Sequence, residues 1–221
     1  MNGAPLSYCG KKVRRFQEAS DLIDFILKNP EYSKGVLQIL GTCMEPQHYS
    51  EAQLRSFTYK FTPKPKSHST VQNLLKSFYH TSKDELNERR GSFLEELIEK
   101  AGPVAGKPFV NKWLACNVFY NQQLLWNIDK DLDVIFEFSP TDIEMHECKA
   151  NLMNFLRKSE ARDKINFMAR LVQYYSANGW QCVAYFPTLC RNPFPEILGL
   201  ENKGLTVLLR DKLSALVTRT A

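Results

Sequence analysis

Apolar positions in the second half of the chain follow strand-like patterns in some segments and helix-like patterns in others. Residues 134–138 form a short run of branched and aromatic side chains, and residues 143–149 run back after a turn-forming segment that includes proline. A strand, a turn and a returning segment predict a β-hairpin. Residues 113–128 are aromatic and apolar and predict at least one earlier strand, while a helical pattern over 152–175 leads to a further strand at 180–189. This order of elements predicts an α/β fold.

The beginning of the chain has a different pattern, which is mainly helical. Apolar side chains recur at helical spacing over residues 16–27. A later helix begins after Ser82, which forms a capping box with Glu85 and is followed by apolar residues at the same spacing. We therefore predict a helical N-terminal region over residues 1–85 and an α/β core over residues 86–221.

Composition bounds the class of protein. With 221 residues and 43% hydrophobic content, the chain can bury a sizeable core. It has no apolar run of the ~18 residues that a membrane span requires, and its first residues lack the apolar core of a secretory signal. We therefore expect a cytoplasmic protein without membrane contacts. The six cysteines include no C-x-x-C pair and lie mostly among apolar neighbours, which predicts buried free thiols.

Charged residues are distributed unevenly along the chain. The net charge is +5, and residues 1–90 account for all of this excess, with 14 Lys or Arg against 9 Asp or Glu. Residues 91–148 carry 4 basic and 10 acidic side chains, whereas residues 149–191 carry 7 basic and 2 acidic ones. Carboxylates thus gather where a cation could bind, and basic side chains follow where a phosphate backbone could pass.

The predicted hairpin brings together side chains suited to metal chemistry. Asp133 would lie opposite the far end of the second strand, where alternation puts Glu147 and Lys149 on one face and His146 and Cys148 on the other. Two carboxylates and one amine would then converge. Mg²⁺ prefers oxygen ligands and keeps several waters, so such a site leaves room for a phosphate and an attacking water. The ammonium could orient that water or offset developing negative charge.

This arrangement resembles the PD-(D/E)XK nuclease superfamily. The matching residues are Asp133 and the Glu-Cys-Lys sequence at 147–149, with thirteen residues between the two acids. Leu132 stands where the family usually has proline. Many members also carry a glutamate four residues after a glycine on the preceding helix, and Gly91 and Glu95 fit that form.

The resemblance implies a restriction-endonuclease-like α-β-β-β-α-β core with a mixed central sheet, and a hydrolase that cleaves nucleic acid with Mg²⁺ or Mn²⁺, with DNA favoured over RNA. It implies that Asp133 and Glu147 bind the metal and that the carbonyl of Cys148 adds an oxygen ligand. Lys149 would position or activate water, and Glu95 is a further candidate for the catalytic site. A homodimer or a larger nucleoprotein complex is compatible with this interpretation.

Three alternatives stay open at this point. The first is a nuclease-like module that has no activity and binds nucleic acid or a protein partner. The second is a small α/β enzyme of unrelated chemistry, although the chain has none of the P-loop, G-x-G-x-x-G, G-x-S-x-G or H-E-x-x-H motifs. The third is a metal site built from scattered cysteines such as Cys182 and Cys190.

Overall fold

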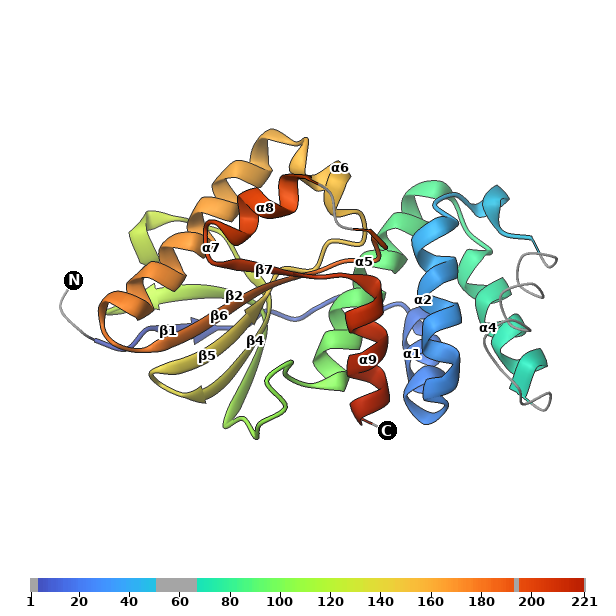
Figure 1. Cartoon of the computed structure of the whole chain (residues 1–221), viewed down its shortest axis with the longest axis horizontal. Helices are drawn as coiled ribbons and strands as arrows, with labels where there is room; N and C mark the ends of the chain where they lie inside the picture. The colour runs from blue at the N-terminus through green and yellow to red at the C-terminus, as the bar shows by residue number, and fades with distance from the viewer. Residues whose placement is uncertain (1–3, 51–66, 193–194, 221) are drawn as a thin grey trace.

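A mixed β-sheet forms the centre of the protein in a computed structural model that describes residues 4–50, 67–192 and 195–220 (Figure 1). Within these residues the sheet has seven strands: β1 (Ser7–Cys9), β2 (Asn111–Tyr120), β3 (Gln123–Leu124), β4 (Leu132–Ser139), β5 (Asp142–His146), β6 (Gln181–Pro187) and β7 (Leu205–Leu208). The strand order is β1-β2-β4-β5-β6-β7, and β3 pairs with β2. Pairing is antiparallel from β1 to β5 and parallel from β5 to β7.

Helices cover both faces of the sheet (Figure 1). Those of the described residues are α1 (Gln17–Lys28), α2 (Ser33–Thr42), α4 (His68–Tyr79), α5 (Lys83–Ala101), α6 (Leu152–Leu156), α7 (Ser159–Ala177), α8 (Pro195–Glu201) and α9 (Arg210–Thr220), with short 3₁₀ turns at Pro30–Tyr32, Pro46–His48 and Leu125–Asn127. One apolar core joins α1, α2, α4, α5 and α9 to the sheet. The other lies beneath α6, α7 and α8.

The order of elements in the core matches the predicted fold class. Helix α5 is followed by β2, β4 and β5, then by α6 and α7, and then by β6. Because β5 and β6 are parallel, the chain must cross over between them, and α6 and α7 make that crossover. The arrangement is an α-β-β-β-α-β core with a mixed sheet, which confirms the restriction-endonuclease-like fold class.

The predicted β4–β5 hairpin is also confirmed, with one difference at its end. Val134 pairs with His146 in an antiparallel register. The second strand ends at His146, three residues earlier than the sequence pattern indicates. The backbone nevertheless continues beside β6, because the N–H of Glu147 donates to the carbonyl of Tyr185 and the N–H of Lys149 to that of Pro187, each at 3.0 Å.

The N-terminal region contributes to the same structure as the core. Leu37, Phe78 and Leu216 belong to one cluster of buried side chains, which draws on both sides of residue 85. Ser7–Cys9 forms a strand within the region predicted to be mainly helical, and it pairs with β2. The division at residue 85 stays a prediction.

Two expectations from composition can be compared with the described residues. None of their helices combines the length and the apolar character needed to cross a bilayer. All six cysteines are free; Cys43, Cys116 and Cys148 are buried as expected, whereas Cys9 is exposed.

Close packing of α2 against the loop after β6 makes Gly41 sensitive to substitution. A Cβ at this position would lie 2.5 Å from the carbonyl oxygen of Leu189, a backbone atom that cannot move without shifting its segment. We expect Gly41→Ala to lower the free energy of unfolding by about 2 kcal/mol. The matched control is Gly199→Ala, because a Cβ there meets nothing within 4 Å. Urea denaturation should show a loss of stability for the first variant alone.

Candidate functional site

The β4–β5 hairpin places two carboxylates at one cavity. Since Val134 pairs with His146, Asp133 and Glu147 lie one residue beyond that pair on the two segments. Both carboxylates line a cavity of about 770 Å³, as does Lys149. The rest of the lining comes from α5, the segment before β4, the segment after β5, and α6 and α7 with Lys158 between them.

The two carboxylates are linked by a network of short polar contacts. The Lys149 Nζ atom lies 2.6 Å from Oε1 of Glu147 and 3.7 Å from Oδ2 of Asp133. Lys164, on α7, lies with its Nζ 2.8 Å from Oε2 of Glu147. The N–H of Cys148 donates to Oδ2 of Asp133 at 2.6 Å. Glu147 is only 1% exposed, so the lysines solvate a carboxylate that water hardly reaches.

Asp133 is held in an environment that disfavours its charge. Burial and the neighbouring carboxylate of Glu147 raise the pKa of Asp133 to about 8, against the opposing effect of Lys149. Perturbed carboxyl groups in clefts are typical of functional sites. A cation that binds beside Asp133 would therefore stabilise the charged form of its carboxyl group.

Lys149 stays charged despite its burial. Burial alone would lower its pKa, but the carboxylates of Asp133 and Glu147 outweigh this effect and raise the pKa above its ordinary value. In the metal-free protein the side chain is therefore an ammonium. It can donate hydrogen bonds and stabilise negative charge, and it cannot accept a proton while it remains charged.

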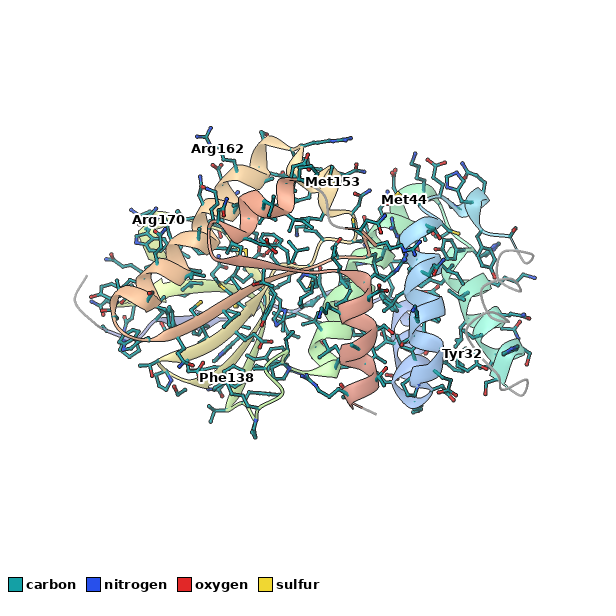
Figure 2. All side chains as sticks on the ribbon, in the orientation of Figure 1. Tyr32, Met44, Phe138, Met153, Arg162 and Arg170 are labelled. Atoms are coloured by element: carbon teal, nitrogen blue, oxygen red, sulfur yellow. The ribbon has the colours of Figure 1, made fainter. Side chains whose placement is uncertain are left out.

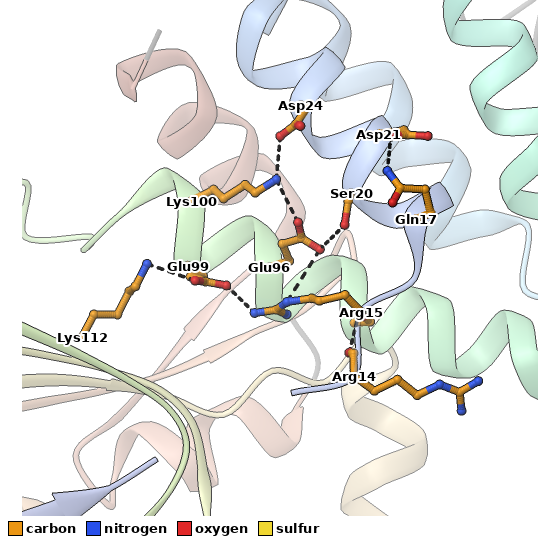
Figure 3. Close-up of polar contacts among 11 residues, drawn as sticks. Arg14, Arg15, Gln17, Ser20, Asp21, Asp24, Glu96, Glu99, Lys100 and Lys112 are labelled. Carbon is orange, nitrogen blue, oxygen red and sulfur yellow. Dashed lines mark hydrogen bonds and ion pairs between the residues drawn. The ribbon is translucent and has the colours of Figure 1, made fainter. Parts of the chain in front are cut away.

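Of the three glutamates near the middle of α5, Glu95 is the one that lines the cavity. Figure 3 shows how the other two are engaged in a structural network. Glu96 lies 2.9 Å from Lys100, and Glu99 forms an ion pair with Arg15. Burial raises the pKa of Glu95, although Lys149 and Arg15 oppose that rise. The glutamate favoured by the glycine spacing thus faces the same cavity as Asp133.

His146 and Cys148 lie away from the carboxylates, as the alternation of side chains predicts. His146 is fully buried, and its Nε2 atom lies 2.8 Å from Glu144. The side chain of Cys148 packs in the core beneath the N-terminal helices, and burial raises the pKa of its thiol. Its thiol is therefore a poor ligand for a hard cation, while a role for its carbonyl stays a prediction.

Lys164 is one of the seven basic residues of 149–191, whose pattern predicts contact with a phosphate backbone, and in the structure it lies beside Glu147. A signal for its role exists in the sequence. Lys164 falls at helical spacing with Ala161, Met168 and Leu171, all of which are buried. A lysine within the apolar face of a helix must reach partners inside the protein, and here they are the carboxylate of Glu147 and the backbone carbonyl of Asp131.

Other basic residues of α7 and its flank do not share this position. Lys158 lines the cavity, whereas Arg162 is exposed and projects outward from α7 (Figure 2). Arg170 lies over the ring of Trp126, with 3.9 Å between its guanidinium carbon and the ring centroid. Solvent exposure therefore explains the position of Arg162, and the cation–π contact with Trp126 explains that of Arg170.

The donor set fits a hard divalent cation with several waters. The carboxylates of Asp133 and Glu147 both line the cavity, and both contacts of Asp133 involve Oδ2, so that Oδ1 makes no polar contact with the described residues. No group of three His, Cys, Asp or Glu side chains in the described ranges is placed to hold a metal by itself.

A divalent cation held by Asp133 and Glu147, as the sequence predicts, would bind in a pH-dependent way. A proton on Asp133 competes with a cation, and the raised pKa of about 8 means that this proton is lost only as the pH passes that value. We expect the rise in Tm caused by Mg²⁺ to increase from about pH 6 to about pH 9. Differential scanning fluorimetry with and without Mg²⁺ tests this. A rise that is equal across the range, or that persists unchanged in Asp133→Asn, would contradict the assignment.

Comparison with known proteins gives solved structures at low sequence identity, among them one from Vibrio cholerae and one from Sulfobacillus thermosulfidooxidans. Protein VC1899 from Vibrio cholerae is 14% identical with a TM-score of 0.43, and the match covers 97% of this chain and 57% of that protein. Can2 from Sulfobacillus thermosulfidooxidans, solved in complex with cyclic tetra-adenylate, is 12% identical with a TM-score of 0.45, covering 96% and 54%. No family model and no curated protein matches the chain. The chain thus spans little more than half the length of either neighbour.

Proposed function

We propose that this protein is a Mg²⁺- or Mn²⁺-dependent nuclease of the PD-(D/E)XK type, which hydrolyses phosphodiester bonds of nucleic acid, with DNA as the favoured substrate. The observation that carries the proposal is the contact of Lys149 with both Asp133 and Glu147 at the edge of an open cavity. These are the three residues of the motif, and the fold supplies the core in which that motif occurs.

Each residue has a distinct chemical role in this proposal. Asp133 and Glu147 would hold the cation, which when bound supplies Lewis acidity to the phosphoryl group and makes water a better nucleophile at neutral pH. The Lys149 ammonium would orient the attacking water and stabilise negative charge in the transition state. Lys164 would fix the orientation of Glu147 from the opposite side. Glu95 would act from α5 as a further acid at the cavity.

Cleavage assays test the proposal directly. Purified protein would be incubated with single- and double-stranded DNA and RNA in the presence of Mn²⁺, beside Asp133→Ala and Lys149→Ala. We expect cleavage by the wild-type protein and loss of cleavage in both variants. Asp142→Asn is a suitable control, because Asp142 lies at the far end of the hairpin and pairs with Lys107. Equal cleavage by the wild-type protein and the two alanine variants would refute the proposal.

A second function is a module without activity that binds nucleic acid or a protein partner. One observation favours it: Lys149 and Lys164 already contact both oxygens of Glu147, so the cluster is partly neutralised without a metal. Isothermal titration with Mg²⁺ or Mn²⁺ distinguishes the two functions. Absence of binding favours the module, whereas binding that disappears in Asp133→Asn favours the nuclease.

A further inference from the structure

One face of α5 forms a wall of the cavity. Asn87, Gly91 and Glu95 lie four residues apart and therefore follow one stripe of the helix, and all three line the cavity. Arg90 lines it from the neighbouring position. This wall extends the site beyond the carboxylates and contains a gap at Gly91.

Packing within the protein does not require glycine at position 91. The residue lies in the middle of a helix of 19 residues, where glycine costs about 1 kcal/mol relative to alanine. A Cβ at this position would meet nothing within 4 Å. The gap opens instead on the cavity, as expected where the backbone of a ligand passes close to a helix.

Arg90, beside this gap, is a buried cation with an incomplete set of partners. It is 2% exposed, and its Nε atom donates to the carbonyl of Leu40 at 2.9 Å. Within the described residues it forms no ion pair with a carboxylate, and its Nη2 atom is buried without a hydrogen-bond partner. A buried guanidinium without an anionic partner costs free energy, and an anion bound beside it would offset that cost.

The end of α2 holds two residues of the cavity in place. Leu40, near the end of α2, accepts the hydrogen bond of Arg90, and Met44, just beyond it, lies 3.6 Å from the side-chain nitrogen of Asn151. Asn151 also lines the cavity. The N-terminal helices therefore hold two residues that line the cavity, Arg90 and Asn151.

We propose that Arg90 and Gly91, with Asn151, form a subsite for a backbone phosphate of the nucleic-acid strand, next to the phosphate that is cleaved. This rests on the proposed function, because the strand is the same substrate. Gly91 lets the strand approach α5, and the fork of Arg90 provides donors that match phosphate oxygens. The N-terminal region then contributes to substrate binding through α2, a role that the sequence pattern leaves unassigned.

Binding of a labelled oligonucleotide tests the subsite separately from cleavage. Fluorescence anisotropy of a fluorescein-labelled DNA strand would be measured in Ca²⁺, which takes the same type of oxygen ligand as Mg²⁺. We expect Gly91→Leu to weaken DNA binding by about tenfold or more, because the side chain fills the path of the strand. Arg90→Gln should weaken it similarly and reduce its dependence on salt.

Two controls separate loss of the subsite from loss of the fold. Gly199→Leu places the same side chain on α8, where a Cβ meets nothing within 4 Å, and should bind DNA as the wild-type protein does. Mn²⁺ titration of Gly91→Leu should give the wild-type affinity, since the carboxylates are unchanged.

The possible results distinguish the subsite from the nuclease. Weak DNA binding by Gly91→Leu with normal Mn²⁺ binding supports the subsite, even if the wild-type protein cleaves nothing and the nuclease function fails. DNA binding by Gly91→Leu and Arg90→Gln within about twofold of the wild-type value overturns the subsite, even if the protein is a nuclease. Absence of DNA binding by the wild-type protein also overturns it.

Discussion

Replacing Asp133 by asparagine is expected to reduce Mn²⁺-dependent cleavage by about a thousandfold, while making the metal-free protein more stable. The substitution keeps the shape of the side chain and an oxygen that can accept from the N–H of Cys148. It removes the charge needed to hold a cation. Loss of activity together with a gain in stability is the pattern expected when a carboxylate is placed for function at the expense of folding.

The gain in stability has a definite dependence on pH. The pKa of Asp133 rises from an ordinary 3.8 to about 8 in the folded protein, chiefly because of burial. The unfolded chain therefore loses this proton first, and the contribution of Asp133 to stability falls as pH rises between those values. Asp133→Asn removes this loss of stability. The free energy of unfolding of the variant should therefore equal that of the wild-type protein near about pH 4 and exceed it by a few kcal/mol above about pH 8.

Urea denaturation of both proteins across this range, in the presence of a chelator, measures the difference. An Asp133→Asn variant that is less stable than the wild-type protein at every pH would show that the charge of Asp133 stabilises the fold. The site would then be a structural ion-pair network.

Replacing Lys149 by methionine is expected to separate metal binding from catalysis. The Nζ atom lies 2.6 Å from Oε1 of Glu147, so its removal frees an oxygen that a cation can use. We expect the affinity for Mn²⁺ to rise by about tenfold, because a competing positive charge is lost. The rate of cleavage at saturating Mn²⁺ should nevertheless fall by at least about a hundredfold, because the transition state loses its ammonium.

Isothermal titration and single-turnover cleavage measure the two effects on the same preparation. Lys164→Met serves as the comparison, since Lys164 contacts the other oxygen of Glu147 from α7. If Lys149→Met cleaved at the wild-type rate once saturated with metal, Lys149 would have no part in the chemical step.

The sequence predicts the part of the site that depends on local pattern. The segments on either side of Pro140 specify a hairpin, and the short turn between Ser139 and Asp142 fixes its register. That register is sufficient to bring Asp133 opposite Glu147. The glycine spacing likewise singles out Glu95 among the acids of α5.

Local sequence patterns do not predict features that depend on contacts between residues distant in the sequence. Strand β1 has only three residues and exists because β2 offers it a partner more than a hundred residues later. The contact between Lys164 and Glu147 requires the packing of α7 over the sheet, and that between Arg90 and Leu40 requires α2 to lie beside α5. In each case the position of the strand or side chain is set by a partner that is distant in the sequence.

The proposed function requires that Asp133 and Glu147 together bind a divalent cation. Diffraction from crystals soaked in Mn²⁺, recorded at the manganese absorption edge, shows whether they do. We expect an anomalous peak within ligand distance of a carboxylate oxygen of each residue. A peak that contacts neither residue, or no peak from protein that is saturated with Mn²⁺ in solution, would contradict it.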